Sequence, residues 1–252
     1  MKTEQEFTDQ FHQDGFCIEP NIIPEATVKA LKQELSIAIE QEAPLRREGI
    51  DDPLQVACCP YYSGIFLDAL EPYIFDRVDV LLGQKSIIYS YNNSSMPPGQ
   101  GNFSSRVHRD SHLDFSQAIQ SIGVIILLDE FTPHNGATWY LPKSHLHMEE
   151  VSDADFYKHA RQLQLPAGSA LFFHPHLVHA GGVNKSDTRR DALSLGFCKP
   201  NMKQRLNLPC LLKEKIPRIK NKRTLQKIGL NAQPPESIQQ FYVKESIWYN
   251  ED

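Results

Sequence analysis

Three side chains in this sequence have the types and spacing of a metal-binding set. In His108-Arg109-Asp110, an imidazole and a carboxylate stand two residues apart, and residues i and i+2 of a strand point to the same side. His179 follows 71 residues after His108, at the end of an apolar run and before a glycine pair. Two histidines and one carboxylate hold iron(II) on one face and leave its other positions open. We therefore expect His108, Asp110 and His179 to bind a metal ion, with no catalytic side chain beyond that centre.

Other histidines nearby compete for the third ligand position. His174 and His176 flank a proline just before His179, but only His179 is followed by glycines that let the backbone turn away without crowding a metal. His112 and Asp114 repeat the His-x-Asp spacing beyond the expected strand end. A hydrogen-bonding or substrate-binding role suits them better than a metal role.

An arginine in the following strand completes the pattern. Arg190 lies eleven residues after His179 and shares a strand face with the small residues Ala192, Ser194 and Gly196. A guanidinium inside a barrel needs an anionic partner, and its fixed fork suits a carboxylate. A dicarboxylate that binds the metal at one end could reach Arg190 with the other.

Taken with this constellation, three motifs resemble the phytanoyl-CoA dioxygenase (PhyH) family of iron(II)- and 2-oxoglutarate-dependent oxygenases. They are the opening Phe7–Phe16 with its Asp-Gly-Phe, the Asn-Gly to Ser-His stretch 135–145, and the distal-histidine segment from His179 to Arg190. The resemblance covers most of the chain.

The resemblance implies a fold, a cofactor and a reaction. The fold is mainly β, a double-stranded β-helix (jelly roll, cupin-like) core with flanking α-helices from the N-terminal region. Iron(II) is held by His108, Asp110 and His179. The cosubstrate 2-oxoglutarate is anchored by Arg190, with Ile125 and Gly181 beside it. With O₂, the reaction releases succinate and CO₂ and hydroxylates an unactivated C–H bond, and we expect ascorbate to stimulate it.

The substrate is less sharply defined by the sequence. The segments expected at the barrel mouth are polar, which favours a small polar or carrier-linked metabolite over a free lipid. Candidate substrate-binding residues are Tyr89, Asn93, Arg109 and His112, and for Asn93 a turn-capping role is equally open. An acyl-CoA hydroxylase and a non-enzymatic jelly-roll metal- or ligand-binding protein are the alternatives. A halogenase is disfavoured because the carboxylate ligand Asp110 is present, whereas desaturation, epimerisation or ring closure by the same iron centre stays open.

The helices and strands that position these residues are predicted from the periodicity of apolar residues and from the prolines, glycines and asparagines that separate the segments. We expect helices over 3–14, from Pro24 onward and over Ile65–Leu82, and a short strand at Phe16–Ile18. Further strands are expected at the ranges 86–91, 106–110, 121–128, 138–141, 169–174, 177–180 and 190–198. We predict a single domain over 1–252, with N-terminal helices (1–85), a jelly-roll core (86–200) and a basic C-terminal extension (201–252).

Composition limits the possible partners. The chain has 252 residues, 40% of them apolar and 23% charged, and a formal net charge of −5. The charge disfavours nucleic acid or anionic lipid as partner, and the longest apolar run, 124–128, is far below the ~20 residues of a membrane helix. A polar start and five cysteines without metal spacing suggest a cytoplasmic protein. The oligomeric state is left open. The basic extension is expected to be a solvated helix face, with a docking patch for a phosphate or an acidic carrier as the alternative.

Overall fold

The computed structural model describes residues 1–112 and 118–242, and its N-terminal helices are well delimited by their capping residues. α1 (Glu4–Asp14) begins with a capping box between Thr3 and Glu6 and ends at Gly15, which has a left-handed φ of 82°. β1 (Phe16–Glu19) follows at once. α2 (Glu25–Glu42) starts after Pro24 and continues into the short 3₁₀ helix η1 (Ala43–Leu45).

The helix predicted over Ile65–Leu82 is wrong, because the chain breaks there into two. α4 (Ile65–Asp68) and α5 (Tyr73–Leu82) are separated by a turn, and α3 (Cys59–Tyr62) precedes them. Pro72 lies in the break. A proline lacks the N–H that a continuous helix needs and clashes with the preceding turn, so the apolar periodicity continues while the helix does not.

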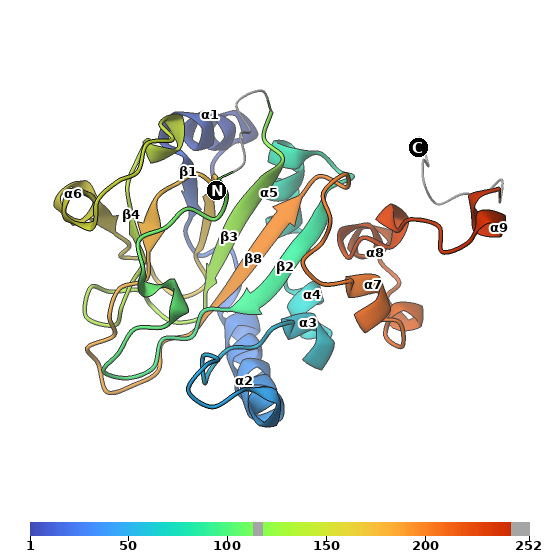
Figure 1. Cartoon of the computed structure of the whole chain (residues 1–252), viewed down its shortest axis with the longest axis horizontal. Helices are drawn as coiled ribbons and strands as arrows, with labels where there is room; N and C mark the ends of the chain where they lie inside the picture. The colour runs from blue at the N-terminus through green and yellow to red at the C-terminus, as the bar shows by residue number, and fades with distance from the viewer. Residues whose placement is uncertain (113–117, 243–252) are drawn as a thin grey trace.

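A five-stranded antiparallel sheet forms the centre of the molecule (Figure 1). Its order is β1-β6-β3-β8-β2, with β2 (Ile87–Asn93), β3 (Ser121–Leu127), β6 (Ala170–Phe173) and β8 (Ala192–Cys198). β3 and β8 pair over seven residues from Ser121↔Cys198 to Leu127↔Ala192. β2 lies at one edge of this sheet and pairs with β8.

A smaller sheet supplies the second layer. It consists of β5 (Arg161–Gln162), β4 (Trp139–Tyr140) and β7 (His179–Ala180), each of two residues. The expected strand 106–110 reduces to a single bridge, in which His108 pairs with His179. α6 (Asp153–His159), with Ser152 as its cap, was not predicted. The short 3₁₀ helices η2 (Phe103–Ser105) and η3 (Ser144–Leu146) lie in the connections.

Alternation along the strands gives the large sheet two different faces. One face packs against the helices, where Leu193, Leu195 and Phe197 of β8 join side chains of α1, α2 and α5 in one core cluster. The other face, carrying Ile125 and Ala192, joins Tyr140 of the small sheet in a second cluster. The space between the two sheets is therefore packed around Ile125, Ala192 and Tyr140, whereas Ser90, Asn92 and Ser194 on the same face of the large sheet are only partly buried.

The basic extension is a solvated face only in part, because Lys213, Arg218, Lys220 and Lys222 are exposed whereas Lys215, Arg223 and Lys227 are engaged by other residues. It contains α7 (Leu208–Leu211), η4 (Ile216–Arg218), α8 (Lys222–Lys227), η5 (Leu230–Ala232) and α9 (Ile238–Phe241), and lies beyond the β2 edge of the sheet (Figure 1). Lys227 is fully buried and pairs with Asp79, and Arg223 pairs with Asp79, Asp76 and Glu71. These ion pairs fasten the extension to α5. That all three parts form a single domain stays a prediction.

None of the helices in the described ranges combines the length and the apolarity needed to cross a membrane.

Candidate functional site

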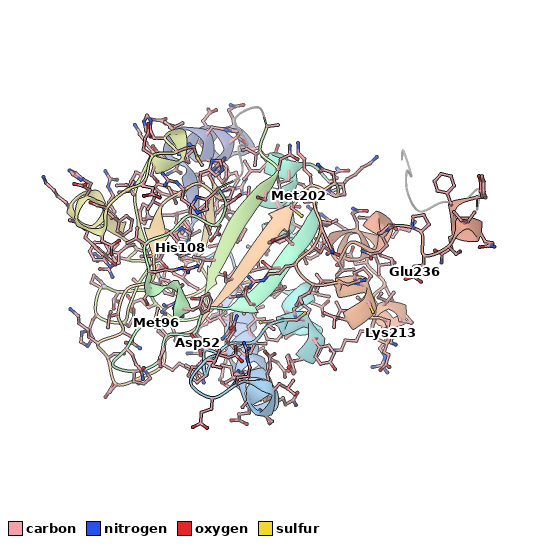
Figure 2. All side chains as sticks on the ribbon, viewed as in Figure 1. Asp52, Met96, His108, Met202, Lys213 and Glu236 are labelled. Carbon is pink, nitrogen blue, oxygen red and sulfur yellow. The ribbon has the colours of Figure 1, made fainter. Side chains whose placement is uncertain are left out.

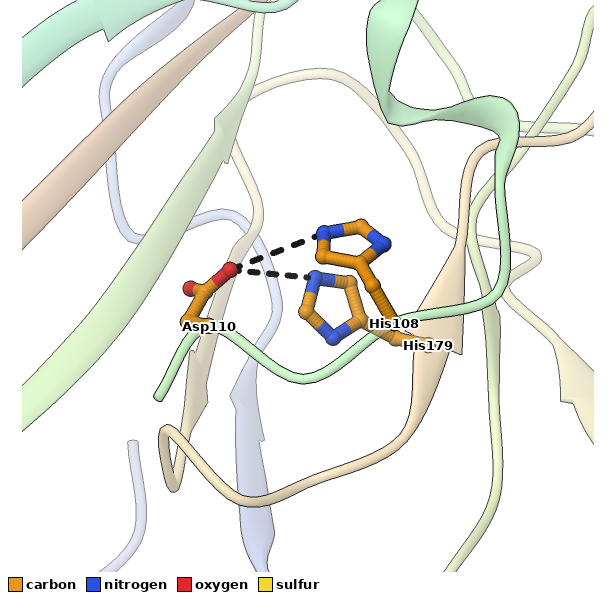
Figure 3. Close-up of side chains that lie close together, drawn as sticks. All are labelled: His108, Asp110 and His179. Carbon is orange, nitrogen blue, oxygen red and sulfur yellow. Dashed lines mark ion pairs between the residues drawn. The ribbon is translucent and has the colours of Figure 1, made fainter. Parts of the chain in front are cut away.

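The structure brings His108, Asp110 and His179 together (Figure 3). Asp110 Oδ1 lies 3.6 Å from His108 Nε2 and 3.8 Å from His179 Nε2. One ligand atom from each residue lies within 4.8 Å of the other two, and this is the only such cluster among the residues that the structure describes. Ligands at ~2.0–2.2 Å from a common ion are separated by distances of this size, so the donor set fits a metal.

Backbone contacts orient both imidazoles. His108 and His179 exchange two main-chain hydrogen bonds of 3.0 Å, which holds the two rings side by side. His108 Nδ1 lies 2.8 Å from Arg106 O, and His179 Nδ1 lies 2.9 Å from Leu177 O. A carbonyl only accepts, so each Nδ1 carries the proton and each Nε2 presents its lone pair toward Asp110. This is the usual arrangement of metal-binding histidines.

The cluster is open on one side. The side chain of Asp110 is 44% exposed, whereas those of His108 and His179 are 20% and 9% exposed. Burial raises the pKa of Asp110, but its interaction with His108 and the charges of His179, His108 and Arg205 outweigh this effect and lower that pKa. Burial lowers the pKa of His179 and so favours the neutral imidazole that a metal needs.

Arg190 lies in the interior with its charge uncompensated by any ion pair in the described ranges. It is 2% exposed, and its guanidinium donates to Ser94 O (3.3 Å) and Gly136 O (3.1 Å) and lies 4.1 Å above the ring of Phe131. Its Nε is buried without a hydrogen-bond partner. Burial lowers the pKa of Arg190 to about 10. A buried, unpaired donor of this kind fits an anionic ligand.

The glycines after His179 connect the two sites. A Cβ on Gly136, whose carbonyl accepts from Arg190, would lie 2.8 Å from Gly182 O. A Cβ on Gly181 would lie 2.8 Å from Ser104 Oγ and 3.0 Å from Met96 Cε, and Met96 bridges to Arg190. Gly181 is therefore needed for close packing around the arginine. Ile125 faces the same interior, opposite Ser194 on β8.

The four candidate substrate residues separate into two groups. Tyr89 is half-buried at an irregularity of the β2–β8 pairing. His112 is exposed, immediately before a segment outside the described residues, where Asp114 also falls. The side chains of Asn93 and Arg109 are instead engaged with other parts of the protein.

The hydrogen bonds of Asn93 and Arg109 hold loops in place. Asn93 is 1% exposed, accepts from Val56 N (2.7 Å) and donates to Leu54 O (2.9 Å) and Ser95 Oγ (2.8 Å). Arg109 donates to four backbone carbonyls, those of Ser144, His147, Glu149 and His176. The expected turn-capping role of Asn93 is wrong, because Asn93 ends β2 and holds the 54–56 loop against the strand. Arg109 ties down the 144–149 segment.

Two aromatic residues of the site are not predicted from the sequence. Phe131 supplies the ring under Arg190, and the ring of Phe173 lies 4.9 Å from that of His179. Their positions depend on pairing between distant strands. No local spacing in the sequence identifies them.

Comparison with known proteins supplies the family. The profile described as Phytanoyl-CoA dioxygenase (PhyH) matches residues 11–192, most of the chain. The chain belongs to the phytanoyl-CoA dioxygenase family. An uncharacterized protein of Mycobacterium tuberculosis is 25% identical over 240 residues, 90% of this chain and 87% of that protein.

Solved structures show the same fold. The carbocyclase SnoK from nogalamycin biosynthesis, an α-ketoglutarate-dependent protein, is 21% identical with a TM-score of 0.66, covering 79% of this chain and 87% of its own. The epimerase SnoN, in complex with Fe³⁺, α-ketoglutarate and a nogalamycin compound, is 17% identical with a TM-score of 0.64, covering 78% of this chain and 84% of its own. The expected jelly-roll core with flanking helices is confirmed.

Membership of the PhyH family also defines the chemistry in outline. The chain is an iron- and 2-oxoglutarate-dependent oxygenase, and it uses O₂. The same fold carries a carbocyclase and an epimerase, so the fold alone does not fix the reaction on the substrate.

Proposed function

We propose that His108, Asp110 and His179 bind iron(II), that Arg190 binds the distal carboxylate of 2-oxoglutarate, and that the protein hydroxylates a C–H bond of a small polar or carrier-linked metabolite. The observation that carries this proposal is the guanidinium of Arg190. It is 2% exposed, and its Nε has no partner. A non-enzymatic jelly-roll protein would have no reason to retain such a group together with an intact donor cluster.

Each side chain has a defined task. The two Nε2 atoms and the Asp110 carboxylate supply three ligands on one side, which leaves room for the cosubstrate and O₂. Bound iron(II) supplies oxidative decarboxylation of 2-oxoglutarate, and the balance is R–H + 2-oxoglutarate + O₂ → R–OH + succinate + CO₂. Arg190 orients the cosubstrate through a two-pronged contact.

Polar side chains on the inner face of the large sheet support a polar substrate. Ser90, Asn92 and Ser194 are partly exposed and lie on the inner face of the large sheet, where Asn92 pairs with Ser194. A pocket for a free alkyl chain would instead be lined mostly by apolar groups. The intact carboxylate ligand Asp110 supports hydroxylation over halogenation.

The test is succinate formation from 2-oxoglutarate with added iron(II) and ascorbate. His108→Ala, Asp110→Ala and His179→Ala should each abolish metal-dependent turnover and lower iron binding by at least tenfold to a hundredfold. His159→Ala is the matched control, because this exposed histidine lies on α6, where its ring bonds the backbone carbonyl of Asp155.

Four outcomes contradict the proposal. Full activity of His179→Ala would show that another residue is the third ligand. Absence of iron-dependent succinate from the folded wild-type protein would remove the enzymatic assignment. A product other than the +16 Da species expected for hydroxylation would show that the reaction is a different one. Stimulation by fatty acyl-CoA alone would show that the substrate is not a small polar compound.

A further inference from the structure

A row of cross-strand partners runs over the inner face of the large sheet, away from the metal cluster. Phe173 on β6 pairs with Gly123 on β3, Gly123 pairs with Gly196 on β8, and Gly196 pairs with Ser90 on β2. Cross-strand partners project from the same face of a sheet. The row starts at the iron side, because the Phe173 ring contacts the ring of His179 at 4.9 Å.

The two glycines leave room for aromatic side chains along this row. A Cβ on Gly123 would overlap the ring of Phe173, so that ring covers the glycine. A Cβ on Gly196 would lie 2.9 Å from Ser90 Oγ and 3.2 Å from Tyr89 Cδ1, so the Tyr89 side chain lies beside the second glycine. Two aromatic side chains thus follow one another from His179 toward the β2 edge. Such rings suit the apolar part of a ligand.

The C-terminal extension returns to this edge. β2 has a register shift between Ile88 and Ser90, which leaves Tyr89 outside the regular pairing with β8. Its carbonyl accepts from Arg205 N at 3.0 Å, and Gln204 Nε2 donates to Ile88 O at 2.7 Å. Met202 lies just past the end of β8, and the chain continues from it to the extension (Figure 2). The first of the two hydrogen bonds fixes the backbone of Arg205 at the end of the row, and the second holds the preceding residue to the same strand.

The side chain of Arg205 differs from the other engaged cations of the extension. Arg223 and Lys227 pair with carboxylates of α5, and Lys215 bonds backbone carbonyls of α3. Arg205 is exposed, and no ion pair involves it in the part of the chain that the structure describes. Arg205 therefore places an exposed positive charge at the end of the row that lies opposite the end beside His179.

We infer that Arg205 binds an anionic group of the substrate, a carboxylate or a phosphate, while the carbon skeleton lies along Phe173 and Tyr89 beside the metal. This inference rests on the proposed function and names the class of its substrate. The family profile ends at residue 192, so the binding group comes from the extension and not from the shared jelly roll. An exposed guanidinium with a fixed backbone suits either anion through a two-pronged contact.

Three aromatic probes test the inference by direct binding. Phenylacetate, phenyl phosphate and 2-phenylacetamide share a ring and differ in charge. Their dissociation constants are measured by calorimetry on protein loaded with zinc(II) and saturating 2-oxoglutarate, which does not turn over. At least one anion should bind roughly 10- to 100-fold more tightly than the amide, the range of a charge-assisted hydrogen bond. The tighter of the two anions identifies carboxylate or phosphate as the natural group.

Variants locate the binding. Arg205→Gln should remove the preference for the anion, and Arg205→Lys should keep part of it. Lys203→Gln is the matched control, since it removes an equal charge from an exposed residue two positions away and should change each constant less than about threefold, as expected for a screened surface charge. Equal binding of the three probes, or an unchanged preference in Arg205→Gln, would overturn the inference. An anion that coordinates the metal instead would give the second result.

A separate readout distinguishes this inference from the proposed function. Succinate formation by the wild-type protein without added substrate tests the metal cluster and Arg190 and involves no substrate anion. If wild-type protein forms no succinate, the proposed function fails, whatever the probes do. If succinate forms and Arg205→Gln leaves the binding of the three probes unchanged, only the inference fails.

Discussion

Arg190 makes the ligand-free protein less stable than its packing alone would. Its burial lowers the pKa of the guanidinium to about 10, which corresponds to about 3 kcal/mol against the charged form inside the fold. The unfolded chain holds this proton more tightly than the folded one. The cost is therefore fully present at every pH below about 10 and is relieved only as the pH rises above that value.

Replacing this charge should separate stability from ligand binding. Arg190→Met keeps a flexible side chain that can pack on Phe131, but it leaves Ser94 O and Gly136 O without their donor, at about 1 kcal/mol each. The free energy of unfolding of the ligand-free protein should thus stay unchanged or rise by about 1 kcal/mol, or ~2–4 °C in Tm. The affinity for 2-oxoglutarate should fall roughly 30-fold to several thousand-fold, since one partner of a desolvated pair is lost.

The assay is thermal unfolding of zinc(II)-loaded protein with and without 2-oxoglutarate, together with calorimetric titration. Ligand at a hundred times the dissociation constant stabilises by about 2.7 kcal/mol, and at the same ligand concentration this gain should fall to about 0.9 kcal/mol or less in Arg190→Met. Arg189→Met is the control, because Arg189 donates to Asp191 (3.0 Å) and Ser36 (2.8 Å). It should lose stability and keep the affinity for 2-oxoglutarate. The reasoning is refuted if Arg190→Met binds 2-oxoglutarate normally, or if it loses more than about 3 kcal/mol of ligand-free stability.

Three further predictions concern stability. Burial, followed by the charges of neighbouring histidines, lowers the pKa of His174 from the ordinary 6.5 to about 3. The unfolded chain therefore binds more protons between these values, and stability should fall by about 2 kcal/mol from pH ~8 to pH ~5. His174→Gln should flatten this slope in denaturant titrations, and an unchanged slope would exclude His174 as its source. Lys143 has a left-handed φ of 66°, so Lys143→Gly should stabilise by about 1 kcal/mol in urea unfolding, and a destabilised variant would contradict this. Asp79→Asn removes the carboxylate that pairs with the buried Lys227, so it should cost about 3–5 kcal/mol. It should also expose the extension to limited proteolysis, and a cleavage pattern like that of the wild type would speak against the proposed fastening.

The sequence predicted those parts of the fold that depend on local patterns. The capped helix before Gly15 and the long alternating strands at 121–128 and 190–198 are confirmed within a few residues. The helix over Ile65–Leu82 failed because a proline outweighs apolar periodicity. The strand at 106–110 failed because only one residue of it finds a partner. α6 was missed since its acidic start resembles a surface loop.

The site shows the same division between local and long-range information. His108 and Asp110 converge because they stand two residues apart, and the glycine pair distinguishes His179 from its neighbours. The direction in which an isolated polar side chain points cannot be predicted in this way, because it depends on packing against distant segments. Arg109 lies in sequence between the ligands His108 and Asp110, yet its side chain donates to backbone carbonyls of the 144–149 segment. The position of Arg205 beside β2 likewise depends on a chain reversal that no local pattern encodes.

The two sheets differ in a way that affects how the protein moves. The large sheet is held by strands of four to seven residues, whereas each strand of the small sheet has two residues and His108 is joined to His179 by a single bridge. Short ladders open locally at a lower free-energy cost than long ones. In hydrogen-exchange experiments the amides of His108 and His179 should thus exchange by local opening and those of β3 by global unfolding. A metal bound across the bridge should slow the first pair selectively.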